Sequence, residues 1–95
     1  MKIIELDLTG CVSLFEIHER IRVAFDFPEW YGKNWDAFWD LLWSECDADK
    51  VIVKGTKSLS QDFEKHIAIM CKILEKEVSF RNNDYLYPFS YEIVS

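Results

Sequence analysis

The sequence predicts an α/β domain in which helices cover a small, largely parallel sheet. Three observations support this prediction. Short apolar stretches typical of strands occur near both ends and in the middle of the chain, and stretches with helical periodicity separate them. The composition, with 49% hydrophobic and 29% charged residues, is that of a globular protein. Because 95 residues suffice for one hydrophobic core, we expect a single domain over residues 1–95.

The first strand and the first helix follow from the N-terminal part of the chain. Residues 2–8, KIIELDL, are short and rich in Ile and Leu, which is typical of a strand. Ser13 and Glu16 have the spacing of a capping box, so a helix should begin there. Apolar residues at helical spacing over residues 14–25 form one stripe that would face the core, and Pro28 lies beyond the expected end of this helix.

A second helix and a second strand are predicted in the middle of the chain. Asn34 is a good N-cap residue, and a helix that begins there would continue to about Glu45. In KVIVKG, residues 50–55, consecutive β-branched side chains indicate a buried strand. These two elements would place an acidic loop between them.

The last third of the chain predicts a long helix and a closing strand. Helical periodicity resumes after TKSLS, with Ser58 or Ser60 as the cap, and ends near Arg81. Residues 82–88, NNDYLYP, have the composition of a loop, and residues 89–94, FSYEIV, alternate as a strand does.

The net charge of −6 is concentrated in one segment. Residues 26–49 contain seven acidic residues and one lysine, a charge of −6, whereas the rest of the chain has ten acidic and ten basic residues. Direct binding of nucleic acid requires clustered Lys and Arg, so this distribution argues against it. The acidic segment suits a cationic partner instead.

The sequence also predicts a cytoplasmic protein without a membrane segment. No run of about 18 uncharged apolar residues is present, and Glu5 and Asp7 interrupt any signal-peptide core at the N-terminus. Cys11, Cys46 and Cys71 fit neither a disulfide framework nor a zinc site, because their spacing is wide and irregular. We expect them to be reduced, half-buried thiols.

The stretch FPEWYGKNWDAFWDLLW, residues 27–43, contains all four tryptophans of the chain. On a helical wheel, Phe38, Leu41 and Leu42 form the core stripe, with Trp35 at its margin. A different arc holds two carboxylates and two indoles: Asp36, Trp39, Asp40 and Trp43. Like charges at i,i+4 destabilise a helix, and an exposed indole gains little in folding.

This arc therefore predicts a binding surface, although tryptophans packed over the core edge beside ordinary solvated aspartates would give the same pattern. The preceding loop would add two rigid rings, Trp30 and Tyr31, before Gly32. The candidate surface consists of seven residues: Trp30, Tyr31, Asn34, Asp36, Trp39, Asp40 and Trp43.

Other functions fit the residues less well. Asp36 and Asp40 could act as paired acid and base or hydrolyse a sugar, but both lie on the same side of one helix, whereas a glycosidase needs carboxylates that flank the bond. A calcium or magnesium site that includes Glu45 lacks a ligand loop with a hinge glycine. We expect no metal and no cofactor, and we expect His18 and His66 at the surface. A carbohydrate-binding module with an aromatic platform remains an alternative.

The run PEWYGKNWDAFWD, residues 28–40, resembles the Pro-Glu-Tyr-Tyr-Gly-x-Asn-x-Asp-Ala-Leu-Trp-Asp signature of the barstar-like ribonuclease inhibitors, with eight or more of thirteen positions identical. The resemblance implies a barstar-like fold, a three-stranded parallel sheet packed with three to four helices. It also implies a protein that is not an enzyme. Such a protein binds a small basic bacterial ribonuclease in a 1:1 complex inside the cell and plugs its cationic active-site cleft.

The resemblance further implies roles for individual residues. Asp40 would occupy the phosphate-binding site of the nuclease, and Asp36 would pair with a cation at the base-recognition rim. Four other side chains would pack around them: Tyr31, Asn34, Trp39 and Trp43. An acid near the end of the last helix contacts the nuclease in this family, and here that acid is either Glu75 or Glu77.

Some positions depart from the family pattern. Trp30 replaces a usual tyrosine, Lys33 stands where an acid is common, and Trp35 and Phe38 enlarge two leucine-like positions. These departures bear on the identity of the target more than on its class. The alternative function is an immunity or interaction protein that binds a different nuclease or toxin.

Overall fold

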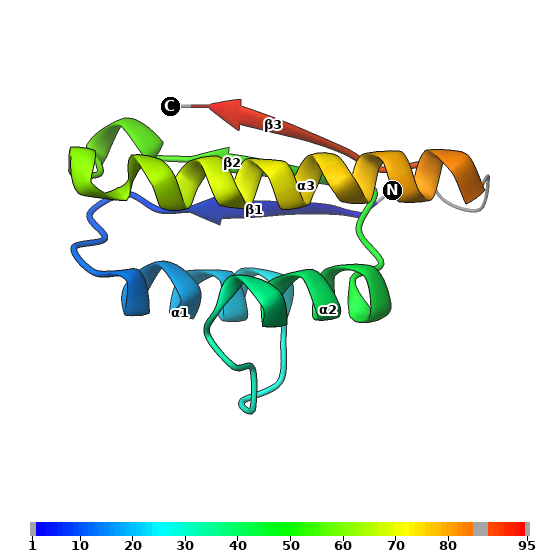
Figure 1. The fold of residues 1–95 in the computed structure, drawn as a ribbon, viewed down its shortest axis with the longest axis horizontal. Coiled ribbons are helices and arrows are strands. Elements are labelled where there is room, and N and C mark those ends of the chain that lie inside the picture. The colour runs from blue at the N-terminus through cyan, green and yellow to red at the C-terminus, as the bar shows by residue number, and fades with distance from the viewer. Residues whose placement is uncertain (1, 85–87, 95) are drawn as a thin grey trace.

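The chain has the predicted α/β architecture in a computed structural model, which describes residues 2–84 and 88–94 (Figure 1). Its elements are β1 (Ile3–Asp7), α1 (Leu14–Phe25), α2 (Trp35–Glu45), β2 (Lys50–Lys54), the short 3₁₀ turns η1 (Thr56–Ser58) and η2 (Gln61–Phe63), α3 (Glu64–Asp84) and β3 (Ser90–Val94). The order of strands and helices read from the sequence is thereby confirmed.

The three strands form one parallel sheet in the order β1-β2-β3. The alternation of side chains buries one face, to which β1 contributes Leu6 and β2 contributes Val51 and Val53. The other face carries ion pairs between neighbouring strands, such as Lys54 Nζ to Glu5 Oε1 at 3.1 Å. The sheet is therefore covered on one face only.

The helices supply the rest of the core. In Figure 1, α3 lies over the sheet and runs along its strands, and α1 and α2 lie beside the β1 edge. Each helix buries one stripe, represented by Ile17 and Ile21 of α1, Phe38 of α2, and Met70 and Leu74 of α3. These side chains and the buried sheet face make one hydrophobic cluster.

Local signals fix where the first two helices begin and end. The Ser13 hydroxyl accepts a hydrogen bond from the Glu16 backbone N–H (3.1 Å), as the capping box predicts. The first helix ends at Asp26, whose left-handed backbone (φ 57°) lets its N–H reach the last helical carbonyls. Asn34 caps the second helix by accepting from the Ala37 N–H (2.7 Å).

The third helix differs from the prediction at both ends. Ser60, one of the two expected caps, binds the Asp62 N–H in the 3₁₀ turn that leads into α3. The helix then continues to Asp84, whereas a loop was predicted from residue 82. Arg81 explains the extension, because its guanidinium anchors this turn to the segment after α2, and such tertiary contacts override local loop preference. Residues 85–87 of the predicted loop lie outside the described residues.

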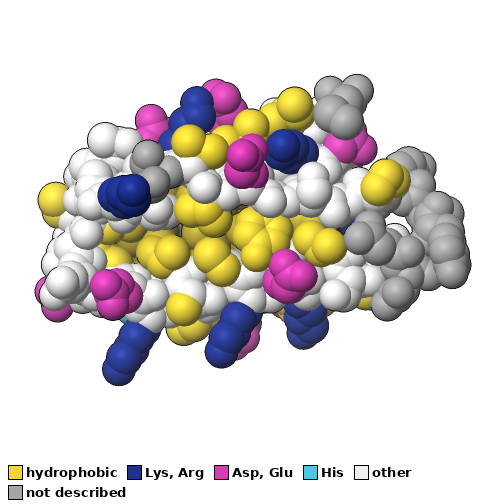
Figure 2. Space-filling view, turned by 90° about the horizontal axis from the view of Figure 1, so that it is seen from above, with side chains coloured by type: hydrophobic (Ala, Val, Ile, Leu, Met, Phe, Trp, Pro, Cys, Tyr) yellow, Lys and Arg dark blue, Asp and Glu magenta, His cyan; other side chains and the backbone are white. Residues whose placement is uncertain are grey.

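The β3 strand forms an open edge of the sheet. Its Ile93 and Val94 are 39% and 42% exposed, and a view from above Figure 1 shows a band of hydrophobic side chains among charged ones (Figure 2). Cys11 is buried, and Cys46 and Cys71 are half-buried free thiols, as expected. Within residues 2–84 and 88–94, no helix is both long enough and apolar enough to cross a membrane.

Candidate protein-binding surface

The loop between α1 and α2 projects from the bottom of the molecule in Figure 1 and carries the first candidate residue. Trp30 is 73% exposed, more than the 49% of Trp43 on α2. Its two apolar loop neighbours, Phe27 and Tyr31, are buried. The Tyr31 N–H donates to the Pro28 carbonyl (3.0 Å), which closes a tight turn and leaves the Trp30 ring in solvent.

Tyr31, predicted to contact a partner, is buried and does not lie on the surface. Its ring is 3% exposed, and its hydroxyl lies 2.7 Å from His18 Nδ1. Burial raises the pKa of Tyr31 well above its usual range, so the hydroxyl stays protonated. The Tyr31 ring therefore anchors the loop to the hydrophobic core.

His18 was expected at the surface, and that prediction is wrong. Its side chain is 1% exposed, between the rings of Tyr31 and Trp35, and its centroid lies 4.4 Å from that of Trp35. Burial, with smaller contributions from the nearby His66 and Lys33, lowers the pKa of His18 to about 4. His18 is therefore neutral at pH 7, and it joins α1 to the loop through Tyr31 and to the start of α2 through Trp35.

The loop reaches α2 through Gly32 and Asn34. The Asn34 side chain is exposed, yet both of its polar atoms are used within the chain, since Nδ2 donates to the Gly32 carbonyl (3.2 Å) and Oδ1 caps the helix. A Cβ at Gly32 would stand 3.3 Å from the Ala37 Cβ, which is a tight contact. The first turn of α2 is thus held in a set orientation before any partner binds.

The outward side of α2 is the part of the candidate surface that agrees best with the helical wheel. Phe38, Leu41 and Leu42 are buried, as predicted. We call the other side the α2 flank, and it comprises Asp36, Trp39, Asp40 and Trp43. Both aspartates are exposed, Trp43 is 49% exposed, and Trp39 is half-buried. Neither aspartate has an ion pair with the described part of the chain.

Glu75 and Glu77, the two acids of α3 between which the sequence does not choose, have different surroundings. Glu77 is 0% exposed, and its Oε2 accepts from Arg81 Nε at 2.9 Å, so Glu77 offers no exposed carboxylate to a partner. Arg81 also donates to the carbonyls of Cys46 and Ala48, both at 2.6 Å, which ties α3 to the end of α2. Glu75 is exposed beside Tyr91 of β3, where burial and this carboxylate raise the pKa of the phenol.

Lys76 and Phe80 of α3 are next to the α2 flank and were missed at the sequence level. The Lys76 ammonium lies 4.3 Å from the centre of the Trp39 ring, and the Phe80 ring contacts Trp39 and Trp43. The i,i+4 spacing of these two residues places them on one face of α3, but the sequence does not show which helix that face meets.

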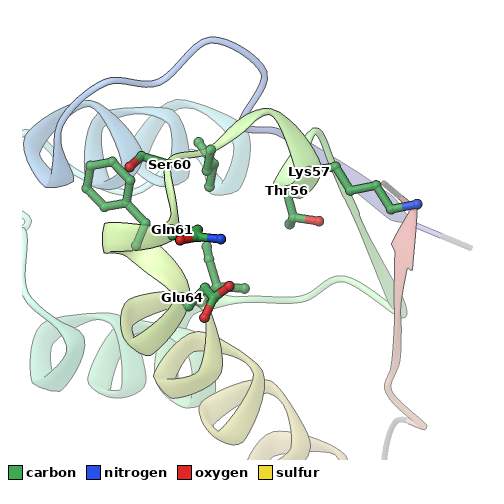
Figure 3. Close-up of a pocket in the computed structure, with 8 residues that line it drawn as sticks. Thr56, Lys57, Ser60, Gln61 and Glu64 are labelled. Carbon is green, nitrogen blue, oxygen red and sulfur yellow. The ribbon is translucent and has the colours of Figure 1, made fainter.

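A pocket of about 380 Å³ lies elsewhere, along the segment that joins β2 to α3. Figure 3 shows Gln61 and Glu64 close together at its centre, with Lys57 pointing away from them. In Figure 1 this segment is at the left end, whereas the loop with Trp30 projects from the bottom. The pocket is therefore separate from the candidate surface. Among the described residues, no group of three or more His, Cys, Asp or Glu could hold a metal ion.

Comparison with known proteins shows the family of this chain. Residues 1–92 match the family model Barstar, described as "Barstar (barnase inhibitor)", and the chain belongs to this family. It is also similar to a Bacillus subtilis (strain 168) protein named "Putative ribonuclease inhibitor YrdF". The two are 30% identical over 63 residues, which is 66% of this chain and 69% of the relative.

Proposed function

We propose that this protein is a stoichiometric inhibitor of a small basic ribonuclease, which it binds in a 1:1 complex in the cytoplasm. The α2 flank and the loop carrying Trp30 would enter the cationic active-site cleft of the enzyme. The proposal rests mainly on one observation: Asp36 and Asp40 are exposed one turn apart on α2, beside the half-buried Trp39 and the exposed Trp43, and neither has an ion pair with the described part of the chain.

A carboxylate on a rigid helix suits the phosphate-binding site of a nuclease. It accepts two parallel hydrogen bonds from a guanidinium, much as a phosphate does. Asp40 lies between Trp39 and Trp43 in sequence on the exposed side of α2, so the flanking rings would exclude water around its ion pairs. We therefore assign the central contact to Asp40 and the neighbouring cation at the rim to Asp36.

The rings supply binding energy that the aspartates alone do not. A surface ion pair in water contributes little, whereas a Trp that fills a partner's pocket is a frequent source of strong binding. Trp30, at 73% exposed on a loop braced by Tyr31 and His18, is the most accessible of these rings. Because the loop and helix are already fixed, few groups need to be ordered on binding.

The acidic segment would also accelerate association. Residues 26–49 carry the full net charge of −6, so the surface should attract a basic enzyme over a distance beyond direct contact. This attraction is screened by salt, with a Debye length of about 8 Å at physiological ionic strength.

The direct test is a pull-down with the intact chain from the source cell, followed by titration of any small basic ribonuclease recovered. We expect RNA cleavage to be abolished at one equivalent of the protein. The variant Asp36→Asn/Asp40→Asn keeps the helix shape but removes both charges, and it should inhibit only at much higher concentration. The control Asp47→Asn/Asp49→Asn removes two charges outside the α2 flank.

Three results would contradict the proposal. In the first, the protein binds no ribonuclease. In the second, the double variant of the α2 flank inhibits as well as the control. In the third, the captured partner is a deoxyribonuclease or another toxin, which would favour the alternative function of an immunity protein with the same acidic surface.

A further inference from the structure

Helix α3 extends the α2 flank with two side chains of a different chemistry. The Phe80 ring stands perpendicular to Trp39, with ring centroids 6.4 Å apart, and lies 6.3 Å from Trp43. Lys76, one turn earlier on the same face of α3, places its ammonium over the Trp39 ring. The acidic surface therefore ends in an aromatic cluster, comprising Trp39, Trp43 and Phe80, with a cation beside it.

The exposure of this cluster exceeds what packing of α2 on α3 requires. Phe80 is 48% exposed and Trp43 is 49% exposed, although both are large apolar side chains in mutual contact. Single exposed apolar residues are common, but adjoining aromatic rings that remain half open mark interaction sites more often. The cluster shares Trp39 and Trp43 with the α2 flank, so a partner seated on that flank would also meet Phe80.

The charge at this border is opposite to that of the flank. Glu77 is buried and paired with Arg81, and Glu75 lies beside Tyr91 of β3, and neither acid forms an ion pair with Lys76 in the described part of the chain. Lys76 is the charged residue that α3 presents to Trp39. A partner that is cationic throughout its contact area would be repelled at this point.

We propose that Lys76 and Phe80 select the target of this protein. The ribonuclease that it binds presents a carboxylate opposite Lys76 and an apolar side chain against the Phe80 and Trp43 rings, next to the cationic cleft that receives Asp40. This inference rests on the proposed function and specifies the partner: an enzyme whose cleft has one acidic, partly apolar rim. Such a rim would exclude basic ribonucleases that lack it, because an unmatched charge at an interface costs binding energy.

Charge reversal at Lys76 tests the ionic contact. Lys76→Glu and the control Lys57→Glu change the net charge by the same amount, and Lys57 lies in η1, away from the α2 flank. Long-range attraction to a basic enzyme should rise slightly in both variants. If the ribonuclease has a carboxylate opposite Lys76, the new glutamate side chain is repelled by it at close range. We therefore expect the Kd of Lys76→Glu for the inhibited ribonuclease to rise by about tenfold or more, and the Kd of Lys57→Glu to stay equal or fall.

Truncation at Phe80 tests the apolar contact. Phe80→Ala should raise the Kd by about fivefold or more, whereas Phe15→Ala, which removes a 64% exposed ring from α1, should leave it unchanged. Thermal unfolding of each variant separates loss of binding from loss of the fold, and Phe80→Leu, which retains an apolar side chain, should restore most of the affinity.

The outcomes distinguish this inference from the proposed function. If the wild-type chain inhibits a ribonuclease and Lys76→Glu binds it equally or more tightly, the inference is wrong and the proposed function stands. If a folded Phe80→Ala variant has an unchanged Kd, the inferred apolar contact is wrong and the proposed function again stands. A wild-type chain that inhibits no ribonuclease overturns both.

Discussion

Asp40 and Glu77 are carboxylates on adjoining helices, yet they lie in opposite environments. Asp40 is exposed, and it makes no ion pair with the described part of the chain. Glu77 is 0% exposed and paired with Arg81, which in turn binds two backbone carbonyls of the neighbouring segment. One acid is therefore available to a partner, and the other holds α3 against the end of α2. Mutation should separate the two roles, because the first contributes to affinity and the second to stability.

Arg81→Ala should give the largest change in stability. It leaves Glu77 buried without its cation and removes two bonds to the carbonyls of Cys46 and Ala48. Loss of one partner from a buried pair costs about 3–5 kcal/mol of unfolding free energy. Chemical denaturation followed by tryptophan fluorescence measures this loss. Arg22→Ala, which breaks the more exposed pair with Glu19, should cost far less, and equal losses for the two variants would refute the structural role of the buried pair.

The pH dependence of stability should reveal the titration of His18, which is buried under the loop between α1 and α2. Its pKa is about 4 in the folded chain, whereas an ordinary histidine has a pKa of 6.5, so the unfolded chain binds more protons between these values. Stability should be full above pH 6.5 and should fall as the pH drops from about 6.5 to 4, by about 3 kcal/mol in all. Denaturation midpoints across this range give the profile.

Two variants assign this pH dependence. His18→Gln retains a polar side chain without titrating, so its stability should vary less between pH 6.5 and 4. His66→Gln alters the half-buried histidine near Trp35 and should preserve the decrease. A decrease of the same size in His18→Gln would show that other groups cause it.

Asp40→Ala should show the reverse of Arg81→Ala. Its unfolding midpoint should stay close to that of the wild type, since the exposed Asp40 carboxylate has no ion pair among the described residues that the substitution would remove. Its Kd for the target ribonuclease should rise by about 30-fold, as expected for a central charged contact. Calorimetry against Asp47→Ala supplies the comparison, and equal affinities would remove the role assigned to Asp40.

The smallest expected effect concerns charges of the acidic segment that lie outside the contact. Asp47→Ala removes a carboxylate whose partner in the chain is the exposed Lys2. We expect the association rate to fall by less than about twofold at physiological salt and the dissociation rate to remain the same, because screening limits the reach of this charge. Stopped-flow binding at several salt concentrations measures both rates. A faster dissociation would place Asp47 within the interface.

Much of the fold follows from local sequence signals. The consecutive β-branched residues at 51–53, the cap at Ser13 and the cap at Asn34 each correctly predicted an element or its first residue. The α2 flank could likewise be predicted, because Asp36 and Asp40 at i,i+4 cannot share the arc occupied by Phe38 and Leu42 without burial of two like charges.

The same signals failed where the surroundings come from distant parts of the chain. Tyr31 follows the exposed Trp30, and two adjacent aromatic residues are typical of a binding loop. Only the contact of Tyr31 with His18 on α1 shows that this ring supports the loop from the core. Glu77 follows Met70 and Leu74 at the spacing of the buried stripe, but a carboxylate is expected in solvent, and its burial depends on Arg81 and on the segment after α2.

The sequence by itself determined the order of strands and helices, the caps, the acidic segment and the exposed side of α2, because these depend on periodicity and on bonds between residues a few positions apart. Tertiary structure alone decided that His18 and Tyr31 are buried together, that Glu77 is buried in an ion pair with Arg81, and that Lys76 and Phe80 border Trp39. Each of these depends on which helix faces meet, and helix packing is set by the shape of the whole core, which no local pattern encodes.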